Sequence, residues 1–193
     1  LAASVHELGA RCQRAVLAVF DTASVLDVVE GARGLLAGGT VRALIDCSTG
    51  DPAAVQALAG RLLARGVDFI EAPLSGSSQQ IAGGEATMLI GAQYDALARH
   101  GALLQALSPT RLHVGGAGLG ARAKLATNLV LGLNRAALAE GMVFAEGLGI
   151  PPATFLALVL ATPARSDAAL LKGERMVRGD FAPQSRIRQH LKD

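Results

Sequence analysis

The sequence predicts an α/β fold with a mostly parallel sheet, followed by an all-helical region that begins with one long helix. Up to Gly120, short apolar runs rich in strand-forming residues alternate with helical segments, a pattern typical of parallel sheets with crossover helices. The apolar runs are continuous, as expected for strands covered on both faces. Beyond Gly120 the pattern is helical throughout. We therefore expect two domains, at residues 1–117 and 118–193.

Five strands are expected in the first domain. The apolar runs lie at residues 14–20, 41–49, 67–73, 85–92 and 111–116. The helical patterns between them lie at residues 22–37, 52–65 and 94–107. The middle helix begins with Asp51-Pro52 and ends before Gly66, which are residues typical of those helix ends. In the second domain we expect helices at residues 121–148, 151–162, 166–177 and 185–193.

The composition argues against several classes of function. Hydrophobic residues make up 51% of the 193 residues, enough for a sizeable core, and the net charge of +2 without a basic run argues against a nucleic-acid partner. Cys12 and Cys47 fit no metal-ligand spacing, so we expect buried thiols and no metal site. No apolar stretch reaches the ~20 residues of a membrane helix. No secretory signal is visible, so we expect a cytoplasmic protein without a membrane partner.

Four glycines lie between Gly115 and Gly120, in the segment GGAGLGARAKLATN that ends at Asn128. A dinucleotide-binding glycine turn follows the first strand of its sheet, whereas this turn follows the last expected strand. We therefore interpret the cluster as a hinge between the domains, since glycine permits backbone turns that other residues resist. Lys124 and Asn128 are four residues apart and share one helix face. The alternative is a pair of solvent-exposed side chains without a function.

Two loops that follow expected strands carry candidate ligand-binding groups. In APLSGSS, Ser75, Gly76 and Ser77 offer a hydroxyl and backbone N–H groups that suit a carboxylate. Open α/β sheets bind ligands at such strand ends. In DCSTGDP, Thr49 lies at a second strand end. The alternatives are an ordinary turn for the first loop and a helix N-cap, at Thr49 or Asp51, for the second.

The segments DCSTGDP, EAPLSGS, GGAGLGARAKLATN and the terminal KD occur in the order seen in the β-hydroxyacid dehydrogenases. The sequence resembles this family, which includes 3-hydroxyisobutyrate dehydrogenase and tartronate semialdehyde reductase, over essentially its whole length. The resemblance implies a Rossmann domain that binds NAD or NADP, joined by a long helix to a helical domain. It also implies an oxidoreductase that exchanges a hydride between this cofactor and a small β-hydroxy acid or its semialdehyde.

The resemblance assigns roles to single residues. Lys124 matches the family's catalytic lysine, a general acid/base at the substrate hydroxyl or carbonyl, a role that requires burial or nearby charge to lower the pKa of the amine. Asn128 matches an asparagine that orients the substrate. The positions that match the loop around the substrate carboxylate are Ser75, Gly76 and Ser77. The positions that match cofactor contacts are Phe20, Asp21, Thr49 and Lys192.

The sequence departs from the family pattern at several positions. Phe20-Asp21 replaces the usual Leu-Pro, Ser77 replaces a glycine, and Thr127 replaces the first asparagine of an Asn-Asn pair. The family's N-terminal strand with its G-x-G-x-x-G turn has no counterpart in the sequence, and neither do the helices after Lys-Asp. We therefore expect this chain to be a fragment of a longer enzyme and to be close to inactive alone.

The sequence leaves two other functions open. One is a non-catalytic binding or assembly module on the same scaffold, favoured by the missing glycine motif and by Asp21. The other is a sugar-acid dehydrogenase of the 6-phosphogluconate dehydrogenase type, with Arg122, Arg135 and Arg165 available for a phosphate. The apolar helical half predicts a homo-oligomer. The exact substrate, the direction of reaction and the choice between NAD and NADP also stay open.

Overall fold

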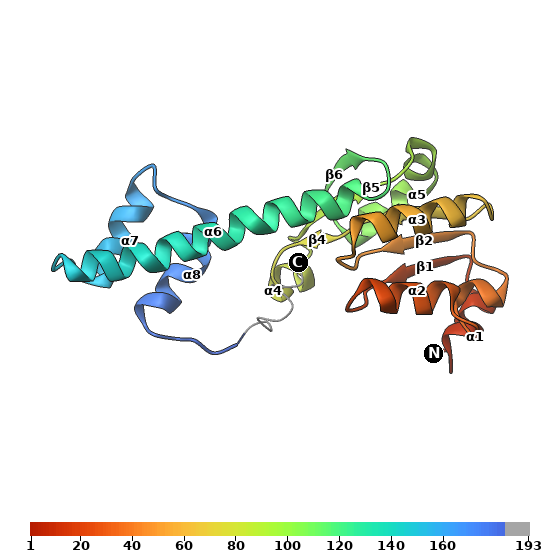
Figure 1. Cartoon of the computed structure of the whole chain (residues 1–193), viewed down its shortest axis with the longest axis horizontal. Coiled ribbons are helices and arrows are strands. Elements are labelled where there is room, and N and C mark those ends of the chain that lie inside the picture. Colours follow the sequence, from red (N-terminus) through yellow and green to blue (C-terminus); the bar gives the residue numbers. More distant parts are fainter. Residues whose placement is uncertain (184–193) are drawn as a thin grey trace. The chain divides into compact units, whose positions relative to one another are not determined.

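The computed structural model describes residues 1–183. The chain divides into two compact units, Leu1–Lys124 and Leu125–Asp193, whose elements are labelled in Figure 1. Helix α6 (Leu119–Gly147) contributes its first turns to the first unit and the remainder to the second. Lys192 and the helix expected at residues 185–193 lie outside the described residues.

The first unit is built on a sheet that has six strands within residues 1–183. The strands are β1 (Arg14–Leu17), β2 (Ala43–Asp46), β3 (Asp68–Glu71), β4 (Leu74–Ser75), β5 (Thr87–Gly91) and β6 (Thr110–Gly115). Their order is β1-β2-β3-β5-β4, with β6 paired to β5. The pairs β1–β2, β2–β3 and β5–β6 are parallel, whereas β5 runs antiparallel to β3 and β4. The predicted α/β fold with a mostly parallel sheet is confirmed, and the exceptions are β5 and β6, which run opposite to β1, β2 and β3.

Helices cover both faces of the sheet. They are α1 (Val5–Arg11), α2 (Thr22–Glu30), α3 (Pro52–Leu63), α4 (Ser78–Ala82) and α5 (Tyr94–Leu107), with a 3₁₀ turn at Leu35–Gly38. Side chains of the central strands alternate between two cores. Leu44 and Phe69 pack in the core beneath α2 and α3, and Ile45 and Ile70 pack in the core beneath α5. Burial on both faces explains why these apolar runs are continuous.

Two predictions for the first unit are wrong in detail. The helix expected at residues 22–37 ends at Glu30. Gly31 is its C-cap: the backbone leaves the helical conformation there, and the Gly31 N–H donates to the carbonyl oxygen of Asp27. A Cβ on Gly31 would lie 2.4 Å from the carbonyl oxygen of Asp27, so a larger residue could not make this turn. The loop expected after residue 73 contains β4 and α4. These elements are too short for sequence periodicity to reveal them.

The second unit is helical, as predicted. After α6 come α7 (Pro152–Ala161) and α8 (Asp167–Val177). One residue allows a close approach of α7 and α8, since a Cβ on Gly173 would lie 2.3 Å from Leu156 Cδ1. The buried core of the unit consists of Leu138, Met142, Leu156, Val159 and Ala169. Within residues 1–183, no helix combines the length and the apolar character needed to cross a membrane.

Candidate active site

Loops that follow parallel strands carry most of the candidate site residues. Phe20 and Asp21 follow β1, Thr49 follows β2, and Ser75 follows β3. Because these three strands are parallel, their carboxyl ends lie at one edge of the sheet. Ligands bind at this edge in open α/β sheets. The structure therefore brings these four residues to a common edge of the first unit.

A hydrogen bond joins the loops after β1 and β2. The backbone N–H of Val19 donates to Ser48 Oγ over 3.0 Å. Phe20, next to Val19, has 48% of its surface exposed, and Thr49, next to Ser48, is half-buried. The joined loops thus present an aromatic ring and a hydroxyl group at two neighbouring strand ends.

Carboxylates occupy the N-termini of α2 and α3. Asp21 accepts hydrogen bonds from the N–H of Ser24 (2.8 Å) and from its hydroxyl (2.7 Å). Asp51 accepts a hydrogen bond from the N–H of Ala54 (2.8 Å), which confirms the helix N-cap considered for this loop. A carboxylate at a helix N-terminus neutralises the partial positive charge there. These two helix ends are therefore poorly suited to a phosphate.

The predicted carboxylate-binding loop is more ordered than expected. Ser75 belongs to β4 and pairs with Thr87 of β5. Gly76 is needed for space, because a Cβ there would lie 2.9 Å from Ala86 Cβ. Ser77 caps α4: its N–H donates to Gln80 Oε1 (2.8 Å), and the N–H of Gln80 donates to Ser77 Oγ (3.2 Å). The expectation of open backbone N–H groups is therefore wrong at Ser77, because a capping box engages that group.

Backbone N–H groups in and beside the glycine cluster bind the side-chain carboxyl group of Glu71. Glu71, at the end of β3, accepts hydrogen bonds from the backbone N–H groups of Gly118 (2.8 Å), Gly120 (3.0 Å) and Ala121 (2.6 Å). Helix N-termini favour negative charge at this position. A Cβ on Gly120 would lie 2.9 Å from Glu71 Cδ, so glycine permits the close approach. The cluster, interpreted above as a hinge, anchors the start of α6 to the end of β3.

Two buried carboxyl groups lie side by side near this anchor. Asp46 and Glu71 are partners in the β2–β3 register, and each is 1% exposed. Burial raises the pKa of both carboxyl groups above its ordinary value, and the charge of Asp46 raises the pKa of Glu71 further. The N–H donors around Glu71, and Ser48 beside Asp46, oppose this effect. Burial and the Asp46 charge together raise the pKa of the Cys47 thiol to about 11.

Cys47 is expected to react slowly with electrophiles. Its pKa of about 11 against the ordinary 9.0 lowers the fraction of thiolate, the reactive form, about a hundredfold at neutral pH. Iodoacetamide should therefore modify Cys47 far more slowly than cysteine in an unstructured peptide, as measured by mass spectrometry of the native chain. Asp46→Asn should accelerate the modification, because it removes a charge that disfavours the thiolate. A wild-type rate equal to that of the peptide would contradict the prediction.

Lys124 and Asn128 lie on a buried stripe of α6. Lys124 is 9% exposed, one turn after Ala121, and Asn128 is half-buried one turn further on. The expectation of a shared helix face is met, and the alternative of two exposed side chains is wrong. Positions of the stripe alternate at spacings of three and four residues. Its members, all buried or half-buried, are Ala121, Lys124, Asn128, Leu131, Arg135, Leu138, Met142 and Ala145.

Two residues acquire significance only in the structure. Glu71 is an acidic residue inside an apolar run of the sequence, a signal of a buried charge, and the family resemblance assigns it no role. Arg135 falls on the apolar stripe of α6, and this spacing is already visible in the sequence. Lys192, the remaining predicted cofactor contact, lies outside the described residues.

Models of two known domains match the chain. The NAD binding domain of 6-phosphogluconate dehydrogenase matches residues 1–116. The model described as NAD-binding of NADP-dependent 3-hydroxyisobutyrate dehydrogenase matches residues 118–193. Together they account for nearly the whole sequence.

Individual proteins are similar over much of the chain. A 2-(hydroxymethyl)glutarate dehydrogenase from Eubacterium barkeri is 31% identical over 159 residues, which are 80% of this chain and 52% of that protein. The cytokine-like nuclear factor N-PAC from Xenopus tropicalis is 29% identical over 188 residues, 97% of this chain and 35% of that protein. The crystal structure of a 3-hydroxyisobutyrate dehydrogenase from Salmonella typhimurium is similar with a TM-score of 0.83 at 26% identity, covering 98% of this chain and 67% of that one. The chain spans about half the length of the 2-(hydroxymethyl)glutarate dehydrogenase and about a third of the length of N-PAC.

Proposed function

The chain belongs to the β-hydroxyacid dehydrogenase family, whose cofactor is NAD or NADP, and we propose that the whole protein exchanges a hydride between this cofactor and a small β-hydroxy acid or its semialdehyde. One observation carries the proposal: a buried lysine, Lys124, lies one turn before Asn128 on the same helix face. Lysine is among the residues least often buried, so its position indicates a chemical role. We propose that residues 1–117 form the cofactor-binding part and residues 118–193 a part of the substrate domain.

The loops after β1 and β2 suit one half of a dinucleotide. Phe20 offers an exposed ring and Thr49 a hydroxyl group. The carboxylates of Asp21 and Asp51 at the neighbouring helix N-termini disfavour a pyrophosphate and favour the positively charged nicotinamide of the oxidised cofactor. We therefore assign Phe20, Asp21 and Thr49 to the nicotinamide half. Lys192 joins them through the family resemblance alone.

The remaining residues handle the substrate in this proposal. When bound, NAD or NADP would supply the hydride acceptor for oxidation of the hydroxyl-bearing carbon and the hydride donor for the reverse reduction. Lys124 Nζ accepts the hydroxyl proton as the carbonyl forms, and donates it back in the reduction. The amide of Asn128 orients the reacting oxygen. Because a capping box engages the Ser77 N–H, Ser75 and Gly76 supply the contacts to the carboxylate, and Ser77 supports the loop.

Hydride transfer by the whole protein, as its host produces it, tests the proposal. A panel of small β-hydroxy acids is offered with NAD⁺ and with NADP⁺, and formation of the reduced nicotinamide is followed by its absorbance. Turnover of a β-hydroxy acid, with none for the matching acid that lacks the hydroxyl group, supports the proposal. A protein that binds the dinucleotide but turns over no member of the panel contradicts it.

A non-catalytic binding module is the second candidate function. The observation that favours it is the similarity to N-PAC, which is named as a nuclear factor. Under this alternative the scaffold binds a partner and performs no hydride transfer. The same panel separates the two functions, because dinucleotide binding without turnover is the expected result for the module.

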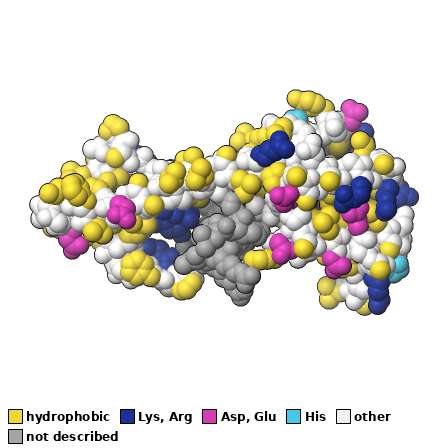
Figure 2. All heavy atoms as spheres, viewed as in Figure 1, with side chains coloured by type: hydrophobic (Ala, Val, Ile, Leu, Met, Phe, Trp, Pro, Cys, Tyr) yellow, Lys and Arg dark blue, Asp and Glu magenta, His cyan; other side chains and the backbone are white. Residues whose placement is uncertain are grey.

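We also propose that the helical unit self-associates. Figure 2 shows hydrophobic side chains (yellow) on the surface of this unit. The exposed large residues include Leu129, Leu133, Val143, Phe144 and Leu148, each at least 59% exposed. Exposed apolar areas of this kind mark interaction sites. Light scattering should give a multiple of the 19.7 kDa chain mass, and a monomer at all concentrations would contradict the proposal.

A further inference from the structure

Arg135 is a cation on the inward-facing stripe of α6. It lies one turn before the core residue Leu138. Its Nε atom is buried and has no hydrogen-bond partner among residues 1–183. Within the same residues no carboxylate lies at ion-pair distance from its guanidinium. Arginine is rarely buried without a partner, and an unsatisfied buried donor often marks a missing ion or water.

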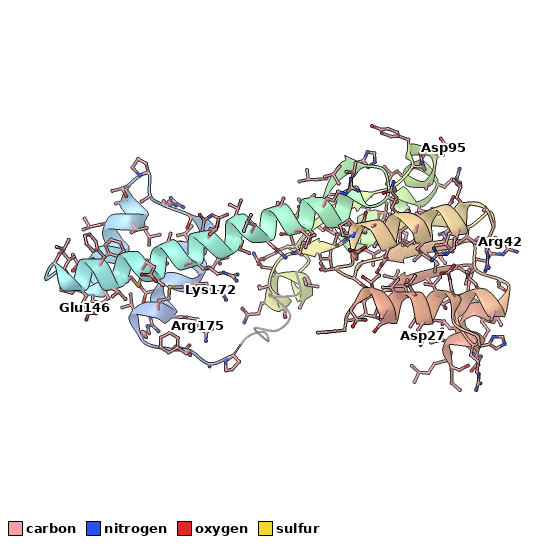
Figure 3. The ribbon with its side chains drawn as sticks, in the orientation of Figure 1. Asp27, Arg42, Asp95, Glu146, Lys172 and Arg175 are labelled. Atoms are coloured by element: carbon pink, nitrogen blue, oxygen red, sulfur yellow. The ribbon has the colours of Figure 1, made fainter. Side chains whose placement is uncertain are left out.

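Further positive charge lies near Arg135. Lys172 and Arg175 are one turn apart on α8 (Figure 3). Arg175 is compensated, because it donates to both carboxylate oxygens of Asp180 at 2.9 and 3.0 Å. Burial and the charges of Arg135 and Arg175 lower the pKa of Lys172. Arg135 therefore lies close enough to Lys172 for the two charges to act on each other.

An open hollow of about 400 Å³ lies along α6 beside Arg135. Asn128 and Gly132 also line it. At 1.5 Å per residue, Asn128 and Arg135 are about 10 Å apart along the helix axis. Both side chains border the same hollow. The hollow can hold a chain of a few carbon atoms between the two side chains.

We propose that Arg135 binds a second acidic group of the substrate, a carboxylate or a phosphate at the end remote from the reacting carbon. The planar guanidinium matches both groups through paired N–H donors. The proposal rests on the proposed function, since it takes Asn128 as the residue at the reacting end. It narrows the substrate class from simple β-hydroxy acids to those with two acidic groups.

Binding of three anions to the chain, without dinucleotide, tests the proposal by calorimetry. Valerate carries one carboxylate, glutarate carries a second one on a chain of the same length, and phosphonobutyrate carries a phosphonate in its place. We expect glutarate or phosphonobutyrate to bind at least about tenfold more tightly than valerate, because a hydrogen bond between Arg135 and the second acidic group, both charged, adds about this much affinity. The tighter of the two identifies the acidic group. Because no hydride is transferred, the result is independent of whether the whole protein is a dehydrogenase.

Two variants complete the test. Arg135→Gln should remove the preference for the second acidic group, whereas Arg178→Gln, which changes an exposed arginine of the same unit, should keep it. Arg135→Met should unfold at the same or a higher temperature than wild type, because it removes an unpartnered buried donor. Equal binding of all three anions to the wild type, or an unchanged preference in Arg135→Gln, would overturn the proposal. A lower melting temperature of Arg135→Met would also count against it, because it would assign Arg135 a structural role.

Discussion

Replacing Lys124 by methionine is expected to lower the turnover of the whole protein about a thousandfold, since general acid–base catalysis contributes ~10²–10⁴-fold. Methionine keeps the length of the side chain and the helix propensity, so α6 should stay intact. It suits a position that is 9% exposed. Affinity for the dinucleotide should change little. Turnover is measured with saturating substrate, and circular dichroism checks that the variant is folded.

Two further variants make the result specific to proton transfer. Arg122→Met changes an exposed cation two residues earlier on the same helix and should leave turnover unchanged. Lys124→Arg keeps the charge, but it should be nearly as slow as Lys124→Met, because a guanidinium does not release its proton in this pH range. Wild-type turnover in Lys124→Met would exclude Lys124 as the acid/base of the reaction.

Replacing Glu71 by methionine is expected to destabilise the first unit by on the order of 3–5 kcal/mol. The change leaves the N–H groups of Gly118, Gly120 and Ala121 without their acceptor. It also removes the negative charge at the start of α6. Relief from burying an ionised carboxyl group, whose pKa burial raises, offsets part of this loss. Urea unfolding followed by circular dichroism measures the difference in free energy.

Glutamine at the same position should have a smaller effect. Its amide oxygen can still accept hydrogen bonds, but its NH₂ group replaces the second acceptor oxygen of Glu71. We expect Glu71→Gln to lie between wild type and Glu71→Met. The matched control is Glu85→Met at an exposed glutamate, which should shift the unfolding midpoint little. Equal midpoints for wild type and Glu71→Met would show that the anchor contributes nothing to stability.

The alternation of apolar runs and helices was sufficient to predict the order of most elements. The runs at residues 41–49 and 67–73 contain β2 and β3, because burial on both faces requires apolar residues at consecutive positions. The direction of β5, which β6 shares, could not be predicted in this way. It follows from the pairing of Leu74 with Met88 in a strand of two residues, and an apolar run carries no information about direction.

The candidate site was predictable where it depends on local spacing. Lys124 and Asn128 share a face because a helix repeats at that spacing, and the same rule would have placed Arg135 on the buried stripe. The partner of the glycine cluster was not predictable, because Glu71 lies far away in the sequence. Glu71 reaches the glycine cluster only in the folded protein, because the assembled sheet brings the end of β3 next to the start of α6.

The anchor at Glu71 also sets an order of events during biosynthesis. Its carboxylate leaves the ribosome well before its last partner, the N–H of Ala121, which follows 50 residues later. β1, β2 and β3 can pair through contacts between neighbours in the sequence, whereas the anchor must close a long loop, at a cost in chain entropy. Until then the carboxyl group of Glu71, at the end of β3, lacks the backbone N–H donors at the start of α6. The nascent first unit is therefore completed only when translation has passed the first turn of α6, and a pause before that point would expose the unfinished edge of the sheet to chaperones and proteases.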